Sequence, residues 1–356
     1  MTPLADILAR RIAKTGPMSL MDFMAECLLH PDHGYYTTRD PLGAAGDFTT
    51  APEISQMFGE LLGLALAQSW MDQGCPAPVT LAEIGPGRGT LMADVLRATK
   101  AVPNMHAAMQ LHLIEASPTL KAAQRDRLAG YDVTWIADAR ALPDQPLWLL
   151  ANEFFDALPI RQFTRDPHGW RETQVALNGA TLAFGLSNPA PITLLDHRLS
   201  DTKVGDVVEI CPAAAPITHE IATRIATYGG AAIIVDYGDW HSFGDTFQAL
   251  EAHNMVDPLA RPGQADLTAH VDFEALARAA TDAGASVSRM LTQGEVLGRL
   301  GIGQRAQRLA ENLDAAALET HIKAFERLTS DAEMGTLFKT IAIAPTRSRL
   351  PPGFDT

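Results

Sequence analysis

Three glycines and an acid stand together in the stretch EIGPGRGT, residues 83–90. An apolar run, 79–84, comes directly before the glycines, and the helical pattern TLMADVLRATK follows them. Glycines between a strand and a helix let the backbone approach a ligand closely, and they leave the N–H groups of the helix N-terminus free to bind it. The same glycines could form an ordinary tight turn, but the strand and the helix around them favour a cofactor site.

The spacing of the glycines separates two classes of cofactor. A dinucleotide fingerprint reads G-x-G-x-x-G, whereas the third glycine here comes one residue early, at Gly85, Gly87 and Gly89. Glu83 would repel a pyrophosphate, but it would attract the ammonium and sulfonium groups of S-adenosylmethionine. These residues, with Thr90 at the start of the helix, therefore predict an S-adenosylmethionine site. A nicotinamide-dependent oxidoreductase is the alternative.

Two further acids follow the next two predicted strands. Glu115 ends the strand 111–116, where a carboxylate can accept hydrogen bonds from both ribose hydroxyls. Asp138 follows the strand 132–137, where a side-chain oxygen can accept a hydrogen bond from the adenine amino group. Either acid alone could be a surface residue or a helix cap. Three acids at the carboxyl ends of three successive strands indicate a nucleoside site.

The candidate reacting groups come after the next strand, 147–152, in the stretch NEFFDALPI. Residues at this point face the reactive end of a ligand that crosses an open α/β sheet. We expect Asn152 to contact the cofactor. We expect Glu153 and Asp156 to be catalytic, because methyl transfer asks the protein mainly to position a nucleophile and to manage its charge. They could instead be a cap and an ordinary acid of a first helical turn.

A long loop early in the chain, residues 30–52, is rich in Gly, Pro, Asp and Thr. Loops of this length are usually functional or disordered. We interpret this one as a lid in which Gly46, Asp47 and Phe48 contact the cofactor. A purely structural loop is the alternative.

The elements that would position these residues alternate between apolar runs and helical stretches, which predicts an α/β fold with a mostly parallel, Rossmann-like sheet. Further strands are expected at 206–211, 231–237, 285–291 and 337–344, and helices at 3–14, 19–29 and 55–72. Turn signals at 167–169 and 178–179 predict an antiparallel β-hairpin insertion.

This reading divides the chain into three parts. An N-terminal helical segment with the lid loop covers 1–75, and the catalytic domain covers 76–345. That domain would carry insertions at about 161–205 and 238–268, and a flexible tail would cover 346–356.

The amino-acid composition limits the kinds of molecule that this protein is expected to bind. The 356 residues carry a formal net charge of −14, which disfavours nucleic acid and suits a cationic partner. The three cysteines, Cys27, Cys75 and Cys211, form no CxxC pair, so no metal site is expected. No apolar run approaches membrane-spanning length and no cleavable signal precedes the first predicted helix, so we expect a cytoplasmic protein without stable membrane insertion.

Several blocks together resemble one family, the MidA-like methyltransferases. They are GDFTTAPEISQMFGELLG (46–63), EIGPGRGTL (83–91), HLIEASPTL (112–120), NEFFDALPI (152–160), GWRE (169–172), VEICPAA (208–214), GGAAIIVDYG (229–238) and ADLTAHVDF (265–273). The first and fourth blocks are specific to the family, whereas the glycine turn is shared by many methyltransferases. The resemblance covers most of the chain, from Gly16 to about Arg305.

The resemblance implies a class I methyltransferase fold with S-adenosylmethionine as cofactor. It also implies a protein substrate that presents an arginine, since the family includes the mitochondrial assembly factor that methylates an arginine of a complex I subunit. A homodimer is compatible with it. A non-catalytic assembly chaperone on the same fold is a further alternative, although the acids after the fourth strand favour an enzyme.

Overall fold

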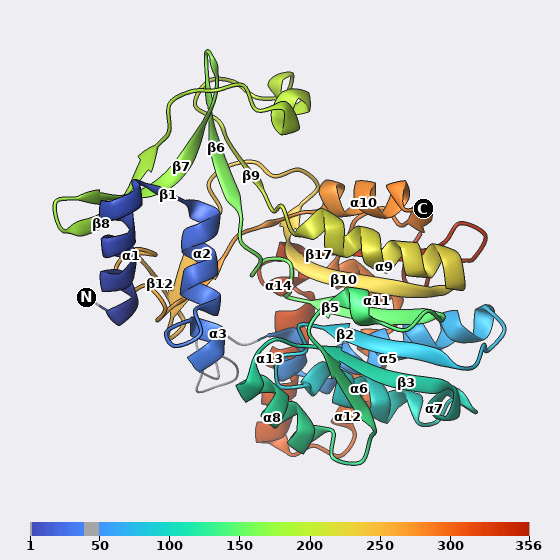
Figure 1. The fold of residues 1–356 in the computed structure, drawn as a ribbon. Coiled ribbons are helices and arrows are strands. Elements are labelled where there is room, and N and C mark those ends of the chain that lie inside the picture. Colours follow the sequence, from blue (N-terminus) through green and yellow to red (C-terminus); the bar gives the residue numbers. More distant parts are fainter. Residues whose placement is uncertain (1, 39–49, 356) are drawn as a thin grey trace. The chain divides into compact units, whose positions relative to one another are not determined.

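A mostly parallel sheet and a set of antiparallel strands belong to two separate units of the chain (Figure 1). The computed structural model describes residues 2–38 and 50–355. The parallel-sheet unit comprises Thr49–Phe155, Ala215–Trp240 and Phe273–Thr356, and the antiparallel unit comprises Met1–Phe48, Asp156–Ala214 and His241–Asp272. The three-part division that the sequence suggested stays a prediction.

The sheet of the parallel-sheet unit has the strand order β15-β17-β10-β5-β2-β3-β4. Its strands within this unit are β2 (Val79–Ile84), β3 (Met109–Ile114), β4 (Val133–Ile136), β5 (Leu147–Asn152), β10 (Gly230–Asp239), β15 (Ala285–Val287), β16 (Leu291–Thr292) and β17 (Phe338–Pro345). The five strands from β10 to β4 run parallel, whereas β15 and β16 pair antiparallel with β17, and β17 with β10. Chain order reverses between β2 and β5, which is where ligands bind in open α/β sheets.

Helices connect the strands of this unit. They are α4 (Ala51–Ile54), α5 (Gln56–Asp72), α6 (Thr90–Thr99), α7 (Met105–Ala108), α8 (Pro118–Arg127), α9 (Ala214–Tyr228), α10 (Phe273–Asp282), α11 (Gln293–Arg299), α12 (Ile302–Ala310), α13 (Ala315–Thr329), α14 (Met334–Leu337) and the 3₁₀ turn η1 (Ala139–Ala141). Their order around parallel strands confirms the predicted α/β class.

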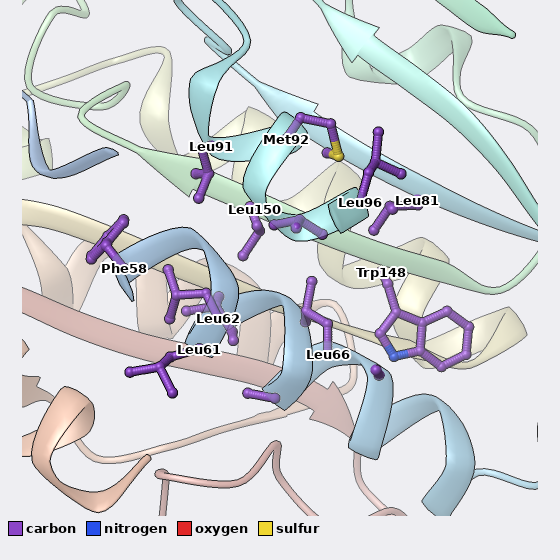
Figure 2. Packing of buried hydrophobic residues seen from close by; sticks show 14 of the residues in the cluster. Phe58, Leu61, Leu62, Leu66, Leu81, Leu91, Met92, Leu96, Trp148 and Leu150 are labelled. Carbon is purple, nitrogen blue, oxygen red and sulfur yellow. The ribbon is translucent and has the colours of Figure 1, made fainter. Parts of the chain in front are cut away.

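Close packing of α5 against α6 builds the core of this unit. Figure 2 shows Phe58, Leu62 and Leu66 of α5 beside residues of α6, β2 and β5. Glycines allow the two helices to approach: a Cβ on Gly59 would lie 2.7 Å from the Cβ of Asp94, and one on Gly63 would lie 2.9 Å from the Cα of Val95. This packing fixes the helix that begins at the glycine turn.

The antiparallel unit contains two small sheets and the first helices of the chain. The larger sheet has the order β1-β7-β6-β9, with β8 also paired to β7, and the other has the order β12-β11-β13. The elements are α1 (Pro3–Thr15), β1 (Met18–Ser19), α2 (Leu20–Leu29), α3 (Tyr35–Thr38), β6 (Arg161–Asp166), β7 (Gly169–Asn178), β8 (Thr181–Leu186), η2 (Thr193–Leu199), β9 (Val207–Ile210), β11 (Gln248–Glu251), β12 (Asn254–Val256), β13 (Asp266–Thr268) and β14 (Val271–Asp272).

Most predicted elements are confirmed, and one strand belongs elsewhere. The strands at 79–84 and 147–152 have the predicted bounds, and the hairpin turns fall between β6, β7 and β8 as expected. The strand predicted at 206–211 exists as β9, but it pairs antiparallel with β6. The predicted tail makes definite contacts: Phe354 packs against the core of the parallel-sheet unit, and Asp355 forms ion pairs with Arg289 and Arg299.

Candidate active site

The glycine turn has the backbone that its residues predict. Gly85, Gly87 and Gly89 have φ values of +67°, +52° and +77°, a region that other L-residues rarely adopt. A Cβ on Gly85 would lie 2.8 Å from the Cδ2 of Phe154, so the turn is tight on that side as well. Gly89 is the N-cap of α6, whose first N–H groups therefore open toward the turn.

Glu83 is the most unusual acid of this region. Its side chain is 2% exposed, and among the described residues its Oε2 has no hydrogen-bond partner. Burial raises the pKa of the Glu83 carboxyl to about 8; a backbone N–H of Met92 lowers this pKa and the nearby Glu115 raises it. A buried carboxylate with an unused oxygen beside three glycines fits a ligand that carries positive charge.

Glu115 is buried just after β3 and holds both oxygens in hydrogen bonds. Its Oε1 accepts from the backbone N–H of Ser117 at 2.7 Å, and its Oε2 accepts from Nε2 of Gln124 at 3.1 Å. Burial raises the pKa of this carboxyl, and these donors lower it. The acid is therefore fixed at the predicted position, with a lone-pair position left for a ligand.

Asp138 has a different setting from the other two acids. It caps the 3₁₀ turn η1, and its carboxylate accepts from the backbone N–H of Arg140 at 2.8 Å. The Arg140 guanidinium also pairs with it and lowers its pKa. The side chain is half exposed. A role toward adenine stays a prediction for this residue.

Thr90 leads to an acid that the sequence analysis missed. Its hydroxyl donates to Oε1 of Glu53, a residue of the short helix α4. Glu53 belongs to the family-specific block at 46–63, but no periodicity distinguishes it from a surface acid. The structure thus places a further carboxylate at the first turn of α6.

The residues after β5 form a strained and well-anchored loop. Asn152 is buried and donates from Nδ2 to Oε1 of Glu153 at 2.9 Å, while its own Oδ1 has no partner among the described residues. Oε1 of Glu153 also accepts from the backbone N–H of Ala51 at 3.3 Å. Glu153 has φ +52°, which is costly for a residue with a side chain.

Asp236, in the second half of β10, anchors this loop. Its Oδ2 accepts from the backbone N–H groups of Phe154 at 3.2 Å and Phe155 at 2.9 Å, and its Oδ1 accepts from that of Tyr237 at 3.0 Å. The side chain is completely buried. These hydrogen bonds hold the loop after β5 in place.

Asp156 belongs to the antiparallel unit, where it is buried. Its carbonyl oxygen accepts from the backbone N–H of Ala269 at 3.0 Å. Burial raises the pKa of Tyr36, and the charges of Asp266 and Asp156 raise it further, while the Tyr36 hydroxyl donates to Asp266 at 2.8 Å. Asp156 therefore has an acidic neighbourhood within its own unit.

Three predicted contacts, Gly46, Asp47 and Phe48, lie outside the described residues. Within residues 2–38 and 50–355, no group of three or more His, Cys, Asp and Glu side chains is arranged to hold a metal ion. None of the helices in these ranges combines the length and the apolar character that a membrane crossing requires.

Comparison with known proteins adds independent information. Residues 61–291 match the model of a family of S-adenosyl-L-methionine-dependent methyltransferases. The chain is 36% identical over 373 residues to protein arginine methyltransferase NDUFAF7, mitochondrial, of Xenopus tropicalis, covering 96% of this chain and 86% of the relative. To the Homo sapiens protein of the same name it is 35% identical over 372 residues, covering 97% and 84%.

Solved structures agree with these relatives. A crystal structure of a Burkholderia thailandensis protein bound to S-adenosyl-homocysteine has 30% sequence identity and a TM-score of 0.84, covering 99% of this chain and 92% of that one. A native crystal structure from the same organism has a TM-score of 0.80. One expectation is overturned: the sequence predicted a cytoplasmic location, but the curated relatives are mitochondrial proteins by name.

Proposed function

This chain belongs to the family of S-adenosyl-L-methionine-dependent methyltransferases, and we propose that its acceptor is an arginine side chain of a protein. The predicted resemblance and the predicted cofactor, S-adenosylmethionine, are both confirmed by the family match and by the similar structure with S-adenosyl-homocysteine. The nicotinamide-dependent alternative is therefore set aside.

The buried carboxylate of Glu83 is the single observation that best supports this site assignment. It has an unused oxygen and is the penultimate residue of β2, two positions before Gly85. When bound, S-adenosylmethionine supplies a methyl group on a positively charged sulfur, together with an ammonium group. Glu83 would neutralise positive charge, Glu115 would bind the ribose, and the N–H groups of the glycine turn and of the start of α6 would bind the remaining polar atoms.

The arginine acceptor is supported by two further points. Relatives with 35–36% identity over nearly the whole chain are named protein arginine methyltransferases. In this chain, Glu153 and Asp156 follow β5, where the sequence predicts the reacting groups. We propose Glu153 as the carboxylate that binds the planar guanidinium and receives the proton that its nitrogen loses on methylation. Asp156 is proposed as a second catalytic acid.

The acceptor protein can be proposed more specifically. We propose a subunit of respiratory complex I, because the MidA-like family includes an assembly factor with this substrate. The net charge of −14 suits a basic segment of such a partner. A homodimer is also proposed, and sedimentation of the purified protein tests it.

Ligand-induced stabilisation tests the cofactor, and labelling tests the acceptor. At about a hundredfold excess over its dissociation constant, S-adenosylmethionine should raise the free energy of unfolding by about 2.7 kcal/mol, whereas NAD should have no effect.

Tritiated methyl groups from the cofactor should appear on arginine when a lysate is offered as acceptor and the product is identified by mass spectrometry. Label on lysine, RNA or a small molecule would contradict the proposal, and binding without any transfer would favour the chaperone.

A further inference from the structure

Gln124 connects the glycine turn with the acid after β3. It lies in α8 and is fully buried, at 0% exposure. Its Nε2 donates to the carbonyl oxygen of Gly87 at 2.7 Å and to Oε2 of Glu115 at 3.1 Å. A primary amide has two N–H donors, and both are used here. One side chain thus holds both parts of the cofactor site.

Trp135, in β4, determines which way this amide faces. Its indole N–H donates to Oε1 of Gln124 at 2.8 Å. An indole N–H can only donate, and a backbone carbonyl and a carboxylate can only accept. The reversed amide would place its oxygen against two acceptors and its NH₂ group against a donor. Only one orientation of Gln124 satisfies all three contacts.

The contact with Gln124 leaves Glu115 ready for a ligand. Ser117 holds one carboxylate oxygen and Gln124 holds the other, so the carboxylate cannot rotate freely. The backbone N–H of Ala116 also stabilises the charged carboxylate, so three of its four lone-pair positions are engaged and one is left for an incoming hydroxyl. The bond to Gly87 likewise fixes the peptide group that follows it, within the turn where Gly87 has φ +52°.

We infer that Gln124 is a positioning residue for the cofactor, and that its amide holds Glu115 and the glycine turn in the geometry that receives the ribose and its neighbouring atoms. The inference rests on the proposed function, which places the cofactor at these residues. Gln124 itself acts through Glu115 and Gly87. Its loss should therefore change binding of the cofactor and leave the chemistry of the saturated enzyme intact.

Substitution of Gln124 by Leu in the full-length protein is the principal test. Calorimetry should show S-adenosylmethionine binding weakened by about 10- to 100-fold, equivalent to one or two hydrogen bonds to charged or constrained groups. The KM for S-adenosylmethionine should rise in step, while kcat at saturation stays within about twofold. Affinity should also fall more steeply below neutral pH, because Glu115 loses a donor that favours its ionised form.

Gln293→Leu is the matched control. Gln293 is a buried glutamine of α11 whose Nε2 donates to the carbonyl oxygen of Leu328 at 2.8 Å. Its substitution removes a buried hydrogen bond without touching the glycine turn. We expect a comparable loss of thermal stability and an unchanged dissociation constant for S-adenosylmethionine. Equal weakening of binding in both variants would overturn the positioning role.

Trp135→Phe provides a second, milder variant should Gln124→Leu fail to fold. It removes the indole N–H together with part of the ring that lies under the Arg125 guanidinium, leaves Gln124 itself in place, and should weaken binding by about three- to tenfold. Combined with Glu115→Ala, either variant should lose less affinity than the product of the separate effects, because the residues act together. Independent effects, or affinity within twofold of the unaltered protein in folded Gln124→Leu, would overturn the inference alone. Failure of the unaltered protein to bind would overturn the proposed function as well.

Discussion

At the scale of single residues, Glu83 links cofactor binding to pH. Burial raises the pKa of the Glu83 carboxyl to about 8 in the folded protein, well above the ordinary glutamate value of 4.5. Between these values the folded state binds more protons than the unfolded chain, so the stability of the unliganded protein should fall as the pH rises. A cationic ligand prefers the ionised form, so its affinity should increase over the same range.

Calorimetry between about pH 6 and pH 9 checks this prediction. S-adenosylmethionine should bind more tightly as the pH approaches 8 in the unaltered protein. Glu83→Gln should bind weakly and without this trend. Methylthioadenosine, which lacks the ammonium and sulfonium groups, is the matched ligand and should show little dependence on pH. A pH-independent affinity for S-adenosylmethionine in the unaltered protein would show that Glu83 does not face its charge.

The predicted catalytic carboxylates can be separated from cofactor binding by neutral substitutions. Glu153→Gln and Asp156→Asn keep the shape of each side chain but remove its charge. Each should leave S-adenosylmethionine affinity within about threefold and lower methyl transfer by about 100-fold or more, comparable to loss of one preorganised charge. Asp126→Asn, a change at an exposed acid of α8, is the control. Full activity in both variants would move the catalytic site elsewhere.

At the scale of elements, Asp236 should matter for the loop after β5 more than for chemistry. An asparagine there would present an NH₂ group to at least one of the three backbone N–H donors. Asp236→Asn should therefore lower the free energy of unfolding by about 1.5 to 3 kcal/mol, as for a lost hydrogen bond to a charged group. Urea denaturation measures this change. Asp239→Asn, an exposed change at the end of the same strand, should have little effect.

Helices and strands with a clear apolar pattern could be predicted from the sequence. The pairing of strands that lie in distant segments of the chain could not. Val79–Ile84 and Leu147–Asn152 are largely apolar runs, which are typical of a strand that is buried on both faces. The strand Val207–Ile210 looks similar in sequence, but its partner, Arg161–Asp166, is selected by the hairpin that precedes it. A short apolar run alone carries no information about which sheet it will join.

The candidate site shows the same division. Glu83, Glu115 and the three glycines were recognisable because they stand at fixed offsets from strands. Gln124 was not recognisable, and neither was the anchoring role of Asp236, because the hydrogen-bond partners of a buried glutamine or of a strand acid cannot be read from the sequence. Their importance lies in hydrogen bonds to backbone groups, which no residue pattern reveals.

At the scale of the whole molecule, the net negative charge of the protein should affect binding of the acceptor more than binding of the cofactor. With a net charge of −14, the protein should attract basic segments of an acceptor. Added salt should weaken this attraction, because it screens interactions between solvent-exposed charges. Raising the salt from about 50 to about 300 mM should therefore increase the KM for a basic acceptor peptide by several-fold, while the affinity for S-adenosylmethionine, bound beside buried acids, changes little. Equal responses of the two ligands, in steady-state kinetics, would contradict this.

Asp236 anchors the loop after β5, so this loop can take its final form only after Asp236 has been synthesised. Asp236 lies 82 positions after Phe154, so a ribosome working at about 5 to 20 residues per second delivers it roughly 4 to 16 seconds later. The contacts among Gly87, Glu115, Gln124 and Trp135 are all encoded earlier. The nascent protein thus completes its ribose-binding contacts first and its reactive loop only after β10 has emerged.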